Sequence, residues 1–261
     1  MAPDVIPFFD EPTNTASYVV RESVGSSCAI IDSVLDLDLA SGRTATTAAD
    51  RIVDYVIAEE LGVAWILETH VHADHLSAAP YLQQKLGGKI GIGENIKTVQ
   101  EVFGKVFNAG TEFERDGSDF DQLFKEQDRF EIGEMSGFVL HTPGHTPACM
   151  TYVIGDAAFV GDTLFMPDFG TARCDFPGGS ARDLWHSIHK ILSLPDDTRI
   201  FTCHDYKAPG RDQFAWESTV GEQKAKNKHI ANATEEEFVE MRESRDATLA
   251  MPKLIIPSMQ A

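Results

Sequence analysis

The chain has 261 residues, 43% of them hydrophobic, and its formal net charge at pH 7 is −19. This composition supports a folded core, and the acidic excess argues against nucleic acid or an anionic membrane surface as a partner. The four cysteines are scattered and form no CxxC pair, the N-terminus is not a leader-like basic segment, and no apolar run reaches membrane-spanning length. Together these features predict a cytoplasmic protein.

The first half of the chain alternates short strands with amphipathic helices. Runs rich in β-branched residues predict strands, and apolar residues at helical spacing predict helices. We expect strands at 17–20, 28–32, 63–67 and 89–92, and helices at 47–60, 76–86 and 96–107. We expect a loop at 33–44.

The second half is richer in strands. We expect strands at 129–132, 137–141, 150–154, 157–160 and 199–203, a helix at 181–194, and mostly helix from 216 onward. This order suggests two mixed β-sheets face to face with helices outside. The predicted fold class is therefore α+β, a four-layer αβ/βα sandwich that forms one domain over residues 1–261.

Metal-binding side chains gather where predicted strands end. Four of them follow strand 63–67 directly: His70, His72, Asp74 and His75. Three more follow later strands: His145, Asp162 and His204. Buried polar groups need partners, and a divalent cation is a strong one. Since strand ends at one edge of a sandwich can converge, we expect one metal site. The remaining histidines match no motif, and we expect ordinary hydrogen-bonded roles for them: His141, His186, His189 and His229.

With these residues, the chain resembles the metallo-β-lactamase superfamily. Residues 70–75 meet its HxHxDH signature, and His145, Asp162 and His204 follow in the superfamily's order. The resemblance extends over essentially the whole chain and implies the four-layer fold with a metal centre.

The superfamily contains two kinds of site. Hydrolases such as glyoxalase II use all seven residues for two ions, with Asp162 as the expected bridge, and activate water against a thioester. Persulfide dioxygenases hold a single Fe(II) with two histidines and one aspartate, which leaves open positions for substrate and dioxygen. The second pattern makes His70, His145 and Asp162 the ligands, and its supporting residues are His72, Asp74, His75 and His204. The ligand set alone does not choose between them.

Two segments outside the ligands favour the dioxygenase. Residues 170–176 resemble its Gly-Arg-Thr-Asp-Phe segment, with a short insertion and with Cys174 in place of Thr. Arg173 would bind a carboxylate of the thiol peptide, and Asp175 would orient Arg173 or accept from a substrate ammonium. Residues 204–206 read His-Asp-Tyr as in that family, whereas glyoxalase II more often has His-Glu-Tyr.

A closer likeness is to a bacterial β-lactamase-hydrolase-like branch that is linked to hydrogen sulfide detoxification. It rests on four segments: 8–15, 161–168, 204–211 and 251–258. The resemblance implies that Lys224 and Asn227 lie near the glutathione carboxylates. Tyr206 either hydrogen-bonds the substrate or oxygen, or is a core tyrosine with a satisfied hydroxyl.

These features imply an Fe(II)-dependent persulfide dioxygenase with one iron per chain. It would oxidise the sulfane sulfur of glutathione persulfide, or a similar persulfide, with O2 and water to sulfite and free thiol. Relatives imply a homo-oligomer, a dimer or larger. The alternative is a dinuclear zinc hydrolase of the glyoxalase II type. A non-catalytic sensor domain is a third hypothesis, and the intact ligand set counts against it. No nicotinamide motif is present, since 91–93 lacks the third glycine of a Rossmann turn.

Overall fold

Two six-stranded β-sheets lie face to face in the computed structural model, which describes residues 2–71, 74–108, 110, 114–252, 254 and 257. The first sheet has the order β1-β2-β3-β6-β8-β9. Its strands are β1 (Asp4–Asp10), β2 (Thr15–Arg21), β3 (Ser27–Ile31), β6 (Gly62–Leu67), β8 (Lys89–Gly93) and β9 (Gln122–Phe124). The first three strands pair antiparallel, and the pairs from β3 to β9 are parallel.

The second sheet has the order β10-β11-β12-β13-β14-β15. Its strands are β10 (Arg129–Ile132), β11 (Met135–His141), β12 (Met150–Ile154), β13 (Ala157–Phe159), β14 (Arg199–Phe201) and β15 (Glu217–Thr219). Neighbours pair antiparallel, except that β13 and β14 are parallel. Strands β11, β13 and β14 therefore run in the same direction, so the loops that follow them leave at one edge.

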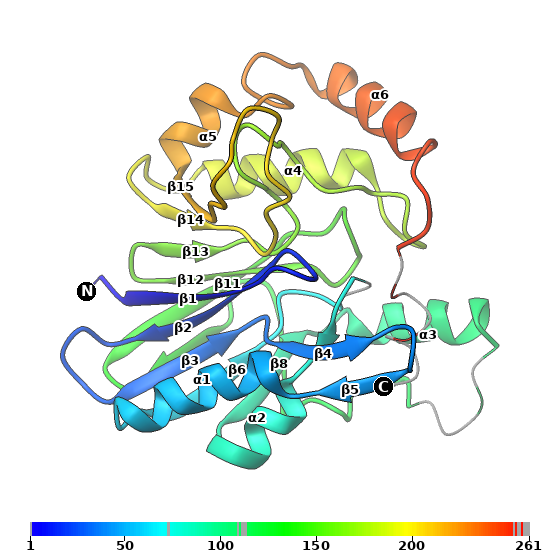
Figure 1. Ribbon diagram of the computed structural model, residues 1–261. Coiled ribbons are helices and arrows are strands. Elements are labelled where there is room, and N and C mark those ends of the chain that lie inside the picture. The colour runs from blue at the N-terminus through cyan, green and yellow to red at the C-terminus, as the bar shows by residue number, and fades with distance from the viewer. Residues whose placement is uncertain are drawn as a thin grey trace.

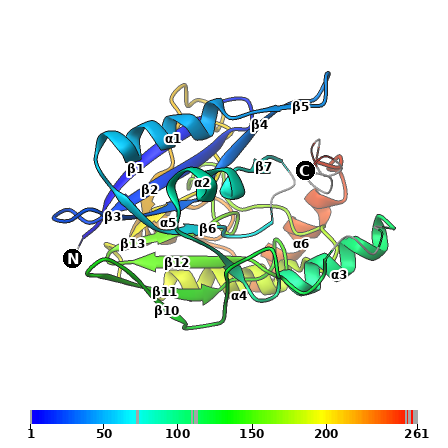
Figure 2. The ribbon, with the colours of Figure 1, turned by 90° about the horizontal axis from the view of Figure 1, so that it is seen from below.

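Helices cover the outer faces of both sheets. Figure 1 shows α4 (Ala181–Leu192), α5 (Val220–Lys226) and α6 (Glu235–Asp246) above the second sheet, with α1 (Thr47–Ala58) and α2 (Ala79–Leu86) below the first. The turned view agrees, and it shows α3 (Ile96–Val106) extending to one side (Figure 2). The predicted four-layer αβ/βα sandwich is confirmed.

The alternation of side chains along the strands builds separate cores between these layers. In β2, Tyr18 and Val20 lie in the cluster between the two sheets, whereas Val19 packs outward with the residues of α1. This is the two-residue period of a strand buried on both faces. On the far side, Ile188 of α4 and Phe238 of α6 pack on the outer face of the second sheet.

Some strands were not predicted, and local patterns explain why. Strand β1 contains Pro7, which lowers strand propensity, and β1 is an edge strand, where proline is tolerated. The expected loop at 33–44 was wrong. It holds β4 (Val34–Asp38) and β5 (Arg43–Ala45), which form a small sheet with β7 (Leu76–Ser77). Strand β5 is exposed and carries no apolar signal, whereas β4 is mostly half-buried, with Leu35 and Leu37 alternating with Asp36 and Asp38.

Within the described part of the chain, no helix has both the length and the apolar character that crossing a membrane requires. All four cysteines are free and buried.

Candidate metal centre and pocket

The loops at one edge of the sandwich bring the predicted ligands together. His70 follows β6 of the first sheet, while His145, Asp162 and His204 follow β11, β13 and β14 of the second. Two contacts between the sheets hold these loops in register. The Met150 amide donates to the Thr69 carbonyl at 2.8 Å, and Thr15 forms a β-bridge with His204.

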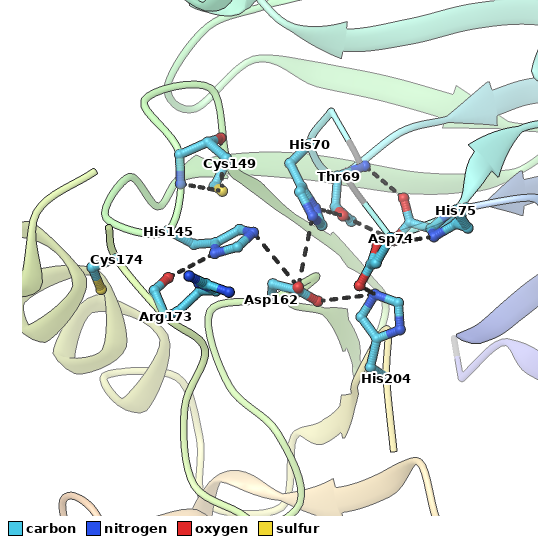
Figure 3. A network of polar contacts seen from close by, with 12 residues as sticks. Thr69, His70, Asp74, His75, His145, Cys149, Asp162, Arg173, Cys174 and His204 are labelled. Atoms are coloured by element: carbon cyan, nitrogen blue, oxygen red, sulfur yellow. Dashed lines mark hydrogen bonds and ion pairs between the residues drawn. The ribbon is translucent and has the colours of Figure 1, made fainter. Parts of the chain in front are cut away.

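His70, His145 and Asp162 form the first cluster, and all three are buried (Figure 3). Both Nε2 atoms face one carboxylate oxygen: His70 Nε2 lies 3.8 Å and His145 Nε2 lies 3.6 Å from Asp162 Oδ2. The two rings meet edge to face, at 85°. Both histidine nitrogens therefore point at a common position beside the carboxylate.

Hydrogen bonds define which nitrogen of each ring carries a proton. His145 Nδ1 lies 2.7 Å from the Arg173 carbonyl, which only accepts, so Nδ1 bears the hydrogen. The Thr69 hydroxyl donates to Asp32 Oδ2 at 2.9 Å and therefore accepts from His70 Nδ1 at 3.0 Å. In both neutral rings, Nε2 then carries a lone pair.

This donor set fits a metal ion. Two lone pairs and a carboxylate oxygen face one another inside the protein, an arrangement that a cation stabilises. Bonds of about 2.0–2.2 Å would bring such ligand atoms to roughly 3–3.5 Å from each other, so the observed separations need only small shifts. The Thr69 and Arg173 contacts are the outer hydrogen bonds that typically orient metal-ligating histidines.

A second cluster lies on the other side of Asp162. It consists of Asp74, His75 and His204. His204 Nε2 lies 3.1 Å from Asp74 Oδ2 and 3.5 Å from Asp162 Oδ1. His75 Nδ1 lies 3.4 Å from Asp74 Oδ1. Asp162 thus presents one oxygen to each cluster (Figure 3).

A glycine allows this close approach. Gly161 has φ +52°, and a Cβ built on it would lie 2.5 Å from Thr69 Oγ1. Only glycine combines this backbone conformation with the contact. The loop that carries Asp162 can therefore lie directly against the loop that carries His70.

A cavity of about 360 Å³ opens beside the first cluster. Four aromatic rings form much of its wall: Phe165, Phe169, Phe176 and Tyr206. The Tyr206 hydroxyl donates to Asp74 Oδ2 at 3.3 Å. Burial, together with the nearby Asp74 and Asp162 carboxylates, raises the pKa of this hydroxyl well above its ordinary value, so it stays a donor at neutral pH. The described lining also includes three arginines: Arg173, Arg242 and Arg245.

The predicted substrate residues differ in whether they line the pocket. Arg173 lines it, and its Nε and Nη2 atoms each donate to Asp175 at 2.6 Å. Lys224 pairs with Asp196, and Asn227 is fully buried, with its side-chain amide on the Gly170 carbonyl and Gln223; neither is part of the described lining. His72 lies outside the described residues. Buried Cys174 borders a different hollow, beside α4 and α6.

Several residues of this site were not predicted from the sequence. Asp32 is the last residue of the predicted strand 28–32 and Thr69 follows the predicted strand 63–67, and this position at a strand end was an available signal. Arg242 and Arg245 carried none, because α6 is charged on most sides.

Comparisons with known proteins agree with this architecture. A family model described as metallo-beta-lactamase superfamily matches residues 10–204. The chain is 55% identical to a probable metallo-hydrolase of Burkholderia pseudomallei, over 97% of this chain and 90% of that protein. It is 56% identical to a beta-lactamase hydrolase-like protein of Agrobacterium fabrum over 99% of its own length, but it spans only 59% of that relative.

Two further similarities are to proteins with a more specific name. The chain is 30% identical to the human mitochondrial protein named persulfide dioxygenase ETHE1, over 87% of this chain and 76% of that one. The crystal structure of ETHE1 from Myxococcus xanthus superimposes with a TM-score of 0.79 at 27% identity, covering 99% of this chain and 97% of that one.

Proposed function

The chain belongs to the metallo-β-lactamase superfamily, and on this premise we propose that it is an Fe(II)-dependent persulfide dioxygenase with residues 1–261 as one catalytic domain. It would oxidise the sulfane sulfur of glutathione persulfide, or a similar small persulfide, in hydrogen sulfide detoxification. The observation that carries the proposal is the buried cluster of two histidines and one aspartate beside a pocket. The similarity to the human and Myxococcus proteins supports it.

In this proposal, His70, His145 and Asp162 would hold the iron through two Nε2 atoms and a carboxylate oxygen. Bound iron would supply the redox chemistry between sulfur and dioxygen. The overall reaction balances without another reductant, because the sulfane sulfur loses the four electrons that dioxygen gains. One dioxygen and one water then yield one sulfite and the free thiol.

The protein's own residues would bind and shield the substrate. The rings of Phe165, Phe169 and Phe176 provide an apolar wall that limits water near the reacting sulfur. The Tyr206 hydroxyl, on the same wall, would donate to a sulfur or oxygen atom of the substrate in place of Asp74 Oδ2. The supporting residues would be His72, Asp74, His75 and His204. We also propose a cytoplasmic location and a homo-oligomeric assembly.

A second candidate function has its own support. Because Asp162 directs one oxygen at each cluster, the same residues can bridge two ions. A dinuclear zinc hydrolase of the glyoxalase II type would use this arrangement to activate water. The name of the Burkholderia relative, probable metallo-hydrolase, points in the same direction.

Metal analysis and oxygen uptake on the same preparation separate these candidates. We expect about one iron per chain, and consumption of one O2 per sulfite formed when glutathione persulfide is added to protein purified without oxygen. Asp162→Ala should lose both metal and oxygen uptake, whereas Asp156→Asn, a surface change in the β12–β13 turn, should keep both. Two zinc ions per chain, no oxygen uptake and rapid cleavage of S-lactoylglutathione would establish the hydrolase instead.

A further inference from the structure

One arginine and two carboxylates join two loops beside the pocket. Arg211 Nη1 and Nη2 each donate to one oxygen of Asp205 at 2.6 Å. Its Nε and Nη2 donate to the two oxygens of Asp168 at 2.7 and 3.2 Å, and Nη1 also donates to the Gln213 carbonyl at 2.8 Å. Each of the five N–H groups of this guanidinium therefore has an acceptor. This bidentate and shared geometry is stronger than a single exposed ion pair.

Asp205 lies between two residues of the site. His204 belongs to the second cluster, and Tyr206 lines the pocket. The Asp205 side chain is buried, and besides Arg211 it accepts from the Ala215 amide at 2.8 Å. A buried carboxylate is costly without such partners. Arg211 therefore stabilises the stretch of backbone that carries His204 and Tyr206.

The turn that follows Tyr206 has an uncommon backbone conformation. Lys207 has φ +55°, a left-handed value that residues other than glycine seldom adopt. Such a conformation persists where surrounding contacts hold it. The Lys207 amide donates to Asp205 Oδ1 at 3.3 Å, so the carboxylate that binds Arg211 also holds this turn.

Asp168, the other carboxylate, directly precedes Phe169 of the aromatic wall. The rings of Phe169 and Tyr206 pack against each other, with their centroids 5.3 Å apart. Tyr206 also meets Phe165 edge to face, at 5.9 Å. Arg211 thus joins the backbones of two loops whose rings form one wall of the pocket.

We propose that Arg211 is a positioning residue of this site, which holds Tyr206 and Phe169 in the pocket wall through Asp205 and Asp168. Arg211 is absent from the described lining of the pocket, so it would act through these carboxylates and not on the substrate. The effect on turnover rests on the proposed function, whereas the effect on the two loops holds for either candidate reaction.

A double-mutant cycle with Tyr206→Phe tests whether Arg211 acts through Tyr206. We expect Arg211→Gln to keep its metal and to lower kcat/KM with glutathione persulfide roughly 10-fold, but only about 2-fold when Tyr206→Phe is already present. A residue with a merely structural role would lower kcat/KM by the same factor in both backgrounds, and that result overturns the proposal. Arg182→Gln removes an equal charge from a surface arginine that pairs with Glu235, and should match the native chain.

Two further variants separate the fork of donors from the charge. Arg211→Lys keeps the charge but cannot serve both carboxylates, so it should recover only part of the lost kcat/KM, and full recovery would overturn the bridging role. Asp168→Asn leaves the buried pair of Arg211 and Asp205 intact and should lower kcat/KM about 3-fold. It gives a result even where Arg211→Gln does not fold, and an unchanged kcat/KM in Asp168→Asn contradicts the proposal.

Hydrogen exchange of the purified protein, followed by mass spectrometry, needs no turnover. We expect Arg211→Gln and Asp168→Asn to exchange faster at 163–170 and 204–211 and at native rates elsewhere. Unchanged or uniformly faster exchange overturns the positioning role. Absence of oxygen uptake by the native chain refutes the dioxygenase proposal instead, and the exchange measurement still decides the role of Arg211.

Discussion

The Thr69 hydroxyl lies 3.0 Å from His70 Nδ1 and is itself held by Asp32, 2.9 Å away. A buried carboxylate thus orients a hydroxyl, and that hydroxyl orients an imidazole whose other nitrogen faces Asp162. This chain of contacts connects the ends of β3 and β6 to the candidate metal position.

Thr69→Val keeps the shape of this side chain but removes the acceptor for His70 Nδ1. We expect metal affinity to fall about 10- to 100-fold, as is typical when an outer partner of a ligating histidine is lost. Competition against a chelator measures this. Thr69→Ser retains the hydroxyl and should bind metal nearly as well as the native chain. Equal affinity of Thr69→Val and the native chain would contradict the positioning role.

Gly161→Ala tests the close packing of the two loops. The added Cβ would collide with Thr69 Oγ1 in a left-handed backbone conformation, so we expect a loss of about 1–3 kcal/mol in the free energy of unfolding and weaker metal binding. Denaturant titration measures the first effect. Gly42→Ala is the matched control. It has φ +66° but no atom within 4 Å, so it should cost only about 1 kcal/mol and leave metal binding unchanged.

Arg173→Ala should retain the metal yet raise KM about 10-fold. The sequence predicts that Arg173 binds a carboxylate of the substrate, and the structure adds a second role. Besides lining the pocket, Arg173 donates to the Ala250 carbonyl, and so fixes the segment that carries Leu249 and Pro252. Metal analysis and steady-state kinetics on the same sample measure both properties. Unaltered KM and kcat would contradict both roles of Arg173, the binding of substrate and the fixing of the segment around Ala250.

His229 should make stability depend on pH. Burial, with the nearby cations of Arg242, Lys228 and Arg245, lowers its folded-state pKa to about 4, below the ordinary value of 6.5, so the unfolded chain binds the proton first as the pH falls. Stability is therefore lost as the pH falls from about 6.5 towards 4. Allowing for partial exposure, we expect this residue to contribute about 1–2 kcal/mol to the difference between pH 7 and 4.5.

His229→Asn keeps an acceptor for the Thr171 amide, which His229 Nδ1 binds at 3.0 Å, but it cannot be protonated. Chemical denaturation at both pH values should therefore show a smaller difference for this variant. His186→Asn, at an exposed position of α4, should follow the native chain. If the free energy of unfolding fell as much between pH 7 and 4.5 in His229→Asn as in the native chain, groups other than His229 would cause the loss of stability in acid.

The sequence by itself determined the architecture, because periodicity reports which faces of a strand or helix are buried. It also identified the superfamily through residues 70–75 and placed His145, Asp162 and His204 after strands, where parallel strand ends bring loops together. The hairpin of β4 and β5 was missed. In β4, Leu35 and Leu37 do alternate with Asp36 and Asp38 in the pattern of a half-buried strand, whereas the three exposed residues of β5 carry no such pattern.

Only the tertiary structure decided what the remaining side chains contact. Asp162 directs its two oxygens at different clusters. Among the described residues, Arg242 and Arg173 have hydrogen-bond partners for their guanidinium groups, whereas Arg245 has none. Lys224 forms a surface ion pair with Asp196 and Asn227 is buried, and neither belongs to the described lining of the pocket. A charged residue looks the same in the sequence whether its partner is solvent, a neighbouring helix or a substrate. That partner depends on contacts between residues far apart in the chain, such as Arg173 with Ala250, which local patterns do not encode.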